Sequence, residues 1–245
     1  MSANRMRVFA GPNGSGKTTI FKALLSKEEI QLGIYVNADD IEQLLNKETS
    51  LSFHSYKLSV SDQGLKNFFR SSKFSPVKRN DADLWRQVSV RDNKLHLTTH
   101  VDAYLAADLA EFIRQQLLVN SISFTYETVM SHKSKIDFFE KAHNQGYRVY
   151  LYYIATEDPE INNSRVNVRV AQLGHAVAPE VITSRYYRSL QNLKVAVRQT
   201  DRTYIFDNSG EQANLIAEIT NGSDVTINKA IKTPNWVEKY LLKQN

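Results

Sequence analysis

The 245-residue sequence contains no cysteine and no apolar run long enough to cross a membrane. The lack of cysteine excludes disulfides, thiolate zinc sites and cysteine nucleophiles, and it fits a reducing compartment. The longest unbroken apolar run covers only residues 149–155. Because residues 5–10 already read as a strand, we expect no secretory leader before them. The sequence therefore predicts a cytoplasmic protein without a membrane partner.

A strong excess of one charge is also missing. The chain has 31 Lys and Arg residues against 26 Asp and Glu residues, a net charge of +5. This mild excess suits a phosphorylated small molecule as well as a nucleic acid, so charge alone selects neither. Hydrophobic residues make up 42% and charged residues 23%, which excludes a disordered or coiled-coil chain. A chain of this length can bury a full hydrophobic core.

Short β-rich runs alternate with helical patterns along most of the sequence, and no internal repeat interrupts them. This order predicts an α/β fold with a mainly parallel sheet of about five strands. The run at 147–155 is rich in Tyr, Val, Leu and Ile, so we expect it at the centre of the sheet. The predicted strands are 7–10, 34–36, 124–126, 147–155 and 204–206, and the predicted helices are 17–25, 39–45, 102–120, 131–144, 158–174 and one from Pro179.

Residues 48–100 break this rhythm and are interpreted as an insertion on the α/β core. Two alternating segments, 88–90 and 95–97, flank residues 91–94 and predict a β-hairpin. A structureless loop of this length would be unusual in a compact domain. The whole chain, 1–245, is expected to form one domain, with a helical lid at 157–200. Its extension at 211–245 has two candidate short strands and a helix from Pro234.

Residues 11–18, GPNGSGKT, match the phosphate-loop pattern G-x-x-x-x-G-K-[ST] and lie between a predicted strand and a predicted helix. Glycines allow positive φ and close approach to phosphate, and successive N–H groups can cradle an anion at a helix N-terminus. The pattern predicts ATP and Mg²⁺, with the ion held through ATP by the Thr18 hydroxyl. The candidate nucleotide-binding residues are Gly11, Asn13, Gly14, Ser15, Gly16, Lys17, Thr18 and Thr19.

Acidic residues follow two of the predicted strands. Asp39 and Asp40 come after the second strand, where a carboxylate could take the proton of a hydroxyl that attacks the γ-phosphate. Asp39 is the preferred base, and the alternative is that both acids only cap the next helix. Glu127 ends the third strand and could order the Mg²⁺ shell or hold a sugar; it could equally be a solvated acid.

Basic residues recur on the two helices after the fourth strand. Arg165 and Arg169 share one helix face, as do Arg185 and Arg188 on the next helix. Such cations could stabilise charge on a transferred phosphoryl group, although a solvated basic face is the alternative. Asn208 follows the fifth strand and is a candidate nucleotide contact or part of a plain turn.

With these motifs in their order, the sequence resembles the zeta-toxin family of phosphate-loop kinases, in its solitary chromosomal branch. The resemblance covers about residues 7–210 without the insertion. The segments that carry it, besides the phosphate loop, are 35–39, 124–128, 146–149, 165–170, 174–177, 182–193 and 207–209.

The resemblance implies a P-loop kinase-like sandwich that binds ATP and Mg²⁺. Well-understood members phosphorylate the 3′-hydroxyl of the amino sugar in UDP-N-acetylglucosamine. By position, Asp39 matches the base of the family and Arg165 matches a lid arginine, with Arg169 next. A separately encoded antitoxin is an implied partner. The residues expected to contact the acceptor are Glu127, Asp40, Thr128 and Arg185.

Three departures keep other interpretations open. Asn37 stands where plasmid-borne toxins usually have an acid, Arg169, Arg185 and His175 compete for the second lid position, and the insertion would lie near the acceptor. The basic helices motivate a polynucleotide or nucleoside kinase as an alternative, although nucleic acid is not the expected partner. The other alternative is a non-catalytic ATP-binding switch that acts through a partner protein.

Overall fold

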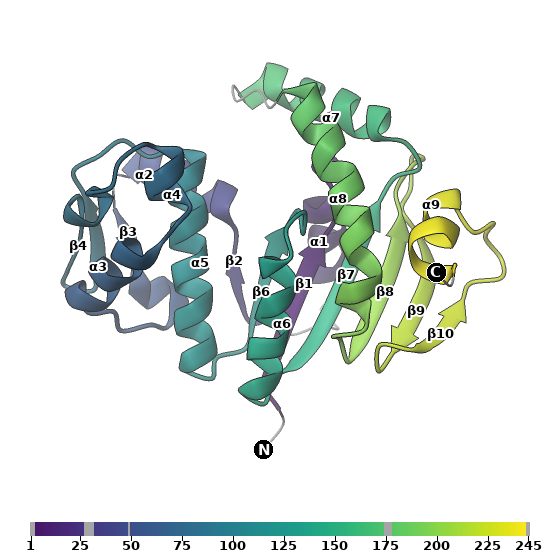
Figure 1. The fold of residues 1–245 in the computed structure, drawn as a ribbon, viewed down its shortest axis with the longest axis horizontal. Helices are drawn as coiled ribbons and strands as arrows, with labels where there is room; N and C mark the ends of the chain where they lie inside the picture. The colour runs from purple at the N-terminus through teal and green to yellow at the C-terminus, as the bar shows by residue number, and fades with distance from the viewer. Residues whose placement is uncertain (1–2, 27–31, 49, 174–177, 244–245) are drawn as a thin grey trace. The chain divides into compact units, whose positions relative to one another are not determined.

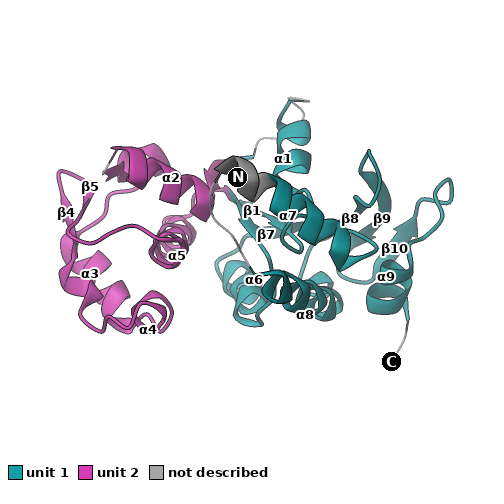
Figure 2. Ribbon diagram, turned by 90° about the horizontal axis from the view of Figure 1, so that it is seen from above, with its two compact units in different colours: residues 1–32, 125–245 teal, residues 33–124 magenta. Residues whose placement is uncertain are grey.

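The structure is a computed structural model that describes residues 3–26, 32–48, 50–173 and 178–243, without the side chains of 169–173. Contacts divide the chain into two compact units (Figure 2). Unit 1 comprises Met1–Leu32 and Thr125–Asn245, and unit 2 comprises Gly33–Phe124. The expectation of a single domain stays a prediction.

The larger sheet confirms the predicted α/β architecture. Its seven strands run in the order β10-β9-β8-β7-β1-β6-β2, so the Tyr-rich β7 is central as expected. β7 pairs in parallel with β1 and with β8, whereas β9 and β10 are antiparallel additions from the C-terminal extension. The strand bounds are β1 (Arg5–Ala10), β2 (Ile34–Val36), β6 (Phe124–Thr128), β7 (Arg148–Ala155), β8 (Arg202–Asp207), β9 (Asn214–Thr220) and β10 (Asp224–Ile227).

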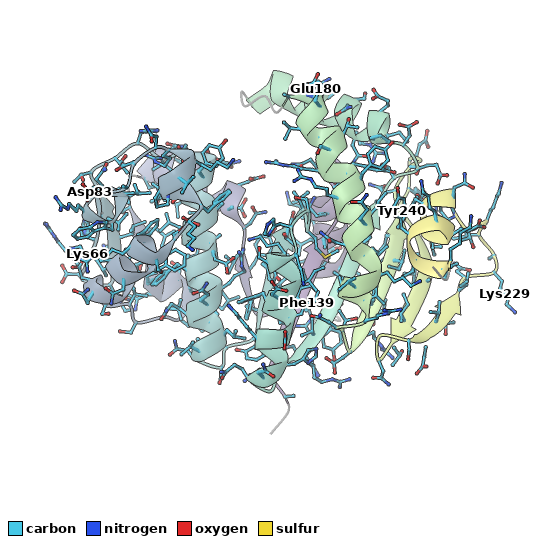
Figure 3. All side chains as sticks on the ribbon, in the orientation of Figure 1. Lys66, Asp83, Phe139, Glu180, Lys229 and Tyr240 are labelled. Atoms are coloured by element: carbon cyan, nitrogen blue, oxygen red, sulfur yellow. The ribbon has the colours of Figure 1, made fainter. Side chains whose placement is uncertain are left out.

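In unit 1, helices cover both faces of this sheet, with α1 on one side and α6 and α8 on the other (Figures 1 and 2). This arrangement explains why β7 is apolar along its length, since a strand covered on both faces needs no polar alternation. Phe139 of α6, labelled in Figure 3, is fully buried in the core. The helices of unit 1 are α1 (Lys17–Leu25), α6 (Ser134–Asn144), α7 (Pro159–Leu173), α8 (Pro179–Val197) and α9 (Asn235–Val237), which continues as the π-helical turn η3 (Glu238–Leu242).

Helix α6 begins three residues later than the sequence pattern predicts. Met130 has a positive φ of 54° and donates its N–H to the Thr128 hydroxyl. The amide of Asn192, in α8, donates to the Met130 carbonyl at 2.9 Å. The chain therefore turns sharply after β6 before the helix can start.

Unit 2 contains the predicted hairpin within a small antiparallel sheet of order β3-β5-β4. Asp92 and Asn93 at its tip both have positive φ, as a tight two-residue hairpin turn requires. Asp102 caps α5 at the start of the predicted helix 102–120, accepting from the N–H groups of Tyr104 and Leu105. The elements are α2 (Ala38–Glu48), β3 (Leu51–Ser52), η1 (Phe53–Tyr56), α3 (Asp62–Ser71), α4 (Ser75–Lys78), η2 (Leu84–Arg86), β4 (Val88–Arg91), β5 (Lys94–Leu97) and α5 (Ala103–Val119).

Candidate functional site

The loop between β1 and α1 has a backbone that only glycine can follow without strain. Gly14 and Gly16 have φ values of 73° and 92°, and Gly16 is the left-handed N-cap of α1. A Cβ atom on Gly16 would lie 2.2 Å from the Asn208 amide nitrogen. One on Gly14 would lie 2.6 Å from the Asn162 carbonyl oxygen. Gly14 and Gly16 are thus both required by conformation and by space.

Two amide side chains, the buried Asn162 and the half-buried Asn208, hold the carbonyl groups of this loop. The Nδ2 atom of Asn162, in α7, donates to the Asn13 carbonyl at 2.5 Å. The Nδ2 atom of Asn208, after β8, donates to the Ser15 carbonyl at 2.8 Å. Because the two carbonyl oxygens are occupied in this way, they cannot turn toward a bound anion. The loop is therefore preorganised to present N–H groups to phosphate.

The first turn of α1 brings together the polar groups that the motif predicts. Lys17 Nζ donates to the carbonyls of Gly11 and Pro12, at 2.9 and 2.8 Å, so the ammonium lies over the loop. The Thr18 hydroxyl donates to Glu127 Oε2 at 3.0 Å. A hydroxyl and a carboxylate are ligand types that Mg²⁺ accepts beside substrate phosphates, so this pair fits the ion. No acid lies in the first turn of α1, where it would repel an anion.

Arg165 contacts the same region from α7. Its Nη1 donates to the Asn208 carbonyl at 2.8 Å and its Nη2 to the Gly210 carbonyl at 3.2 Å. The guanidinium therefore lies beside the loop that follows β8. Its predicted contact with phosphate stays a prediction.

For the remaining predicted site residues of unit 1, the structure gives fewer contacts with the phosphate loop. The Thr128 carbonyl accepts the Gly11 N–H at 3.2 Å, and Thr19 is exposed on α1. Arg185 is half-buried on α8. The side chain of Arg169 and the whole of His175 lie outside the described residues.

Asp39 and Asp40 lie in the first turn of α2, within unit 2. The cap of this helix is Asn37, whose Oδ1 accepts the Asp39 N–H at 2.8 Å. The Nδ2 atom of Asn37 donates to the Tyr35 hydroxyl at 2.9 Å. Asn37 thus fills the capping role that the sequence left open for the two acids. Burial, and then the negative charge of Asp40, raise the pKa of Tyr56 to about 12.

Asn162 is a residue of this site that the sequence analysis missed. It is fully buried, and its Oδ1 accepts a hydrogen bond from the Thr156 hydroxyl while its amide holds the phosphate loop. It belongs to no motif, because its partner in the loop is a backbone carbonyl. Its signal in the sequence is only that of a polar residue near the start of a helix that follows a central strand.

Cavities, possible metal ligands and apolar helices elsewhere in the described residues add no second site. Two open cavities of about 450 and 490 Å³ lie in unit 1, and neither is lined by the phosphate loop. Among the residues that the structure describes, no three His, Asp or Glu side chains gather as a metal cluster. In the same part of the chain, no helix has the length and apolar character to span a bilayer.

Comparison with solved structures finds a similar fold in other proteins. Over 97% of its length the chain is similar to a structure of AvrRxo1-ORF1:ORF2 with ATP, at 14% identity and a TM-score of 0.59, covering 63% of that chain. It also resembles, over its full length, a structure from the PezAT chromosomal toxin–antitoxin system of Streptococcus pneumoniae, at 13% identity and a TM-score of 0.52, covering 80% of that chain. These likenesses show the shared fold.

Sequence comparison adds a shorter match. A Haemophilus influenzae protein is 35% identical over 65 residues, which are 26% of this chain and 46% of that protein. The chain thus spans less than two thirds of the AvrRxo1 chain and about half of the Haemophilus protein.

Two family models match the sequence. The ABC transporter model matches residues 1–132, which include the phosphate loop that nucleotide-binding families share. The zeta toxin model matches residues 90–220, more than half of the chain, from the hairpin of unit 2 through β6, α7, α8 and β8 to β9. Together with the fold shared along the full length with a toxin–antitoxin structure, this match shows that the chain belongs to the zeta toxin family.

Proposed function

We propose that the protein transfers the γ-phosphate of ATP to a hydroxyl group of a small molecule, a UDP-amino sugar. The observation that carries this proposal is the preorganised phosphate loop, with Lys17 over it and the Thr18–Glu127 pair at the start of α1. Membership of the zeta toxin family supports a phosphotransferase, and the structure solved with ATP in a similar fold supports the donor.

In the proposed reaction, the Asp39 carboxylate accepts the proton of the acceptor hydroxyl. The hydroxyl oxygen forms a bond to the γ-phosphorus, while the bond from that phosphorus to the β–γ bridging oxygen breaks and ADP leaves. Asp39 follows β2 as the phosphate loop follows β1, and ligands of open α/β sheets bind outside such strand ends. Asn37 caps α2 and thereby fixes the Asp39 backbone.

Cationic groups would carry the charge of the transferred phosphoryl group. Lys17 would bind the outer phosphate oxygens, and Arg165 would approach from α7. Thr18 and Glu127 would hold Mg²⁺, which when bound neutralises charge on the phosphates. Arg169 is proposed as a second lid cation. The proposed acceptor contacts are Glu127, Asp40, Thr128 and Arg185, and the proposed protein partner is a separately encoded antitoxin, since solved relatives of the fold include toxin–antitoxin proteins.

The test is incubation with Mg-ATP and a panel of UDP-sugars, followed by mass spectrometry. We expect a product about 80 Da heavier, the mass of one added phosphoryl group. Lys17→Ala and Asp39→Ala should abolish it with the far-UV circular dichroism spectrum unchanged. Lys22→Ala, an exposed lysine of the same helix α1, should leave product formation intact.

Other outcomes would contradict the proposal in specific ways. Phosphorylation of an oligonucleotide or nucleoside, without any sugar product, would indicate the alternative kinase class. Nucleotide binding without acceptor-dependent ADP release would indicate a switch protein. Full activity of folded Lys17→Ala would remove the phosphate loop from the mechanism.

A further inference from the structure

One tryptophan of the C-terminal extension, Trp236, contacts the end of strand β8, next to the residue that supports the phosphate loop. Trp236, in α9, is 3% exposed, and its ring centroid lies 6.0 Å from that of Tyr153 in β7. Its indole Nε1 donates to Asp207 Oδ1 at 2.8 Å. Asp207 is the last residue of β8 and immediately precedes Asn208. Two consecutive residues, Asp207 and Asn208, therefore connect the tryptophan to the phosphate loop, with one hydrogen bond at each end.

The Asp207 carboxylate organises the turn in which Asn208 lies. Its Oδ1 accepts from the Ser209 hydroxyl at 2.9 Å, and its Oδ2 accepts from the Ser209 N–H at 3.2 Å. The Ser209 Oγ in turn accepts the N–H of Glu157, in the loop after β7, at 2.8 Å. The carboxylate thus holds Ser209, the residue after Asn208, and the Asn208 amide holds the Ser15 carbonyl.

A second bond ties the same extension to the loop after β7. The N–H of Asn235 donates to Glu157 Oε1 at 3.2 Å. The extension therefore contacts both loops that supply the phosphate loop with its supports, Asn208 after β8 and, through α7, Asn162 after β7. Within this contact, the indole N–H bond to Asp207 distinguishes Trp236 from a side chain that only fills the core.

We infer that Trp236 is a positioning residue for nucleotide binding. It acts through Asp207 and Asn208 by keeping the Ser15 carbonyl turned away from the phosphates. The inference rests on the proposed function only in taking ATP as the ligand of the loop. If Trp236 contributed packing alone, removing its indole N–H while keeping an aromatic ring would leave nucleotide affinity unchanged.

The experiment measures the Kd of Mg-ATP by titration calorimetry. Trp236→Phe keeps an aromatic ring and removes the donor, so we expect its Kd to rise about tenfold, as for loss of a hydrogen bond to a charged group. Asp207→Asn, a second variant that removes the charge, should weaken binding similarly. The matched control is Trp85→Phe, the same change at the chain's other tryptophan, which lies in unit 2 beside Arg70. The control should bind ATP like the wild type.

A double-mutant cycle tests the route of the effect. In an Asn208→Ala background, Trp236→Phe should change the Kd less than twofold, because its path to the loop is already interrupted. A Trp236→Phe variant with wild-type Kd would overturn the inference, as would a full tenfold loss added to that of Asn208→Ala. A wild-type protein that binds no ATP would refute the proposed function itself.

Discussion

Gly16 meets two separate demands at a single residue. Its left-handed backbone starts α1, and its missing side chain leaves room for the Asn208 amide. Either the positive φ or the contact with Asn208 alone would disfavour another residue at position 16. The second requirement comes from a residue far away in the sequence.

We therefore expect Gly16→Ala to weaken Mg-ATP binding more than tenfold. The added methyl would displace Asn208 and strain the backbone by about 1–3 kcal/mol. Gly210→Ala is the matched control, since no atom lies within 4 Å of its Cβ position. Calorimetric titration of both variants tests this, and equal Kd values for them would contradict the steric argument.

At the residue scale, the sequence predicted those groups whose chemistry forms a local pattern. Lys17 and Thr18 belong to one motif, and Glu127 was predicted from its place at a strand end; the structure places its carboxylate against Thr18. Asn162 and Trp236 could not be predicted in this way. Their partners are a backbone carbonyl and a distant aspartate, and neither contact leaves a spacing that can be recognised.

Helix α8 is attached to the loop and strand beside it by two buried tyrosine hydroxyls. The Tyr153 hydroxyl of β7 lies 3.0 Å from Ser189 Oγ. The Tyr186 hydroxyl of α8 donates to the Thr156 carbonyl at 2.7 Å. Burial is the main cause that raises the pKa of both tyrosines well above the ordinary value of 10.0.

The stability of the protein should accordingly fall in alkaline solution. A raised folded-state pKa means that the neutral tyrosine stabilises the fold fully below pH 10, and that this contribution is lost as the pH rises above it. Urea unfolding between pH 8 and 11.5 should show the decline. Tyr153→Phe should flatten it, whereas Tyr187→Phe, at an exposed position of α8, should not. An unchanged slope for Tyr153→Phe would contradict this assignment.

At the scale of elements, local signals located most helices and strands. The capping residue Asp102 and the phosphate-loop motif placed the starts of α5 and α1 correctly. The start of α6 was placed too early, because the turn at Met130 depends on Asn192, more than sixty residues away. From the sequence, β9 and β10 were predicted only as two candidate short strands in the C-terminal extension. Their antiparallel pairing, of β9 with β8 and of β10 with β9, follows no part of the βαβ alternation from which the other strands were predicted.

For the whole molecule, the phosphate loop should couple nucleotide binding to stability. ATP at one hundred times its Kd should add about 2.7 kcal/mol to the free energy of unfolding. For a chain of this size that corresponds to a rise in Tm of about 5–10 °C. Differential scanning calorimetry with and without Mg-ATP measures the shift. Lys17→Ala should show none, and an equal shift in that variant would mean that ATP binds elsewhere.

The bounds of the two compact units were harder to predict from the sequence than the helices and strands were. The broken rhythm pointed to an insertion at 48–100, whereas unit 2 extends over Gly33–Phe124. The reason is that α2 and α5, which flank the insertion, pack on each other and join it. A helix that contacts an insertion looks in the sequence like any other helix of the α/β alternation.

Strand β10 is an edge strand of the large sheet, and its length and charge affect the tendency of the protein to aggregate at high concentration. A terminal strand offers unpaired peptide groups to which a neighbouring molecule can add its own strand. β10 is only four residues long and begins with the exposed Asp224, although Val225 is 44% exposed. Its shortness and its negative charge oppose such intermolecular growth, so the added strands extend the sheet without making it a template for aggregation.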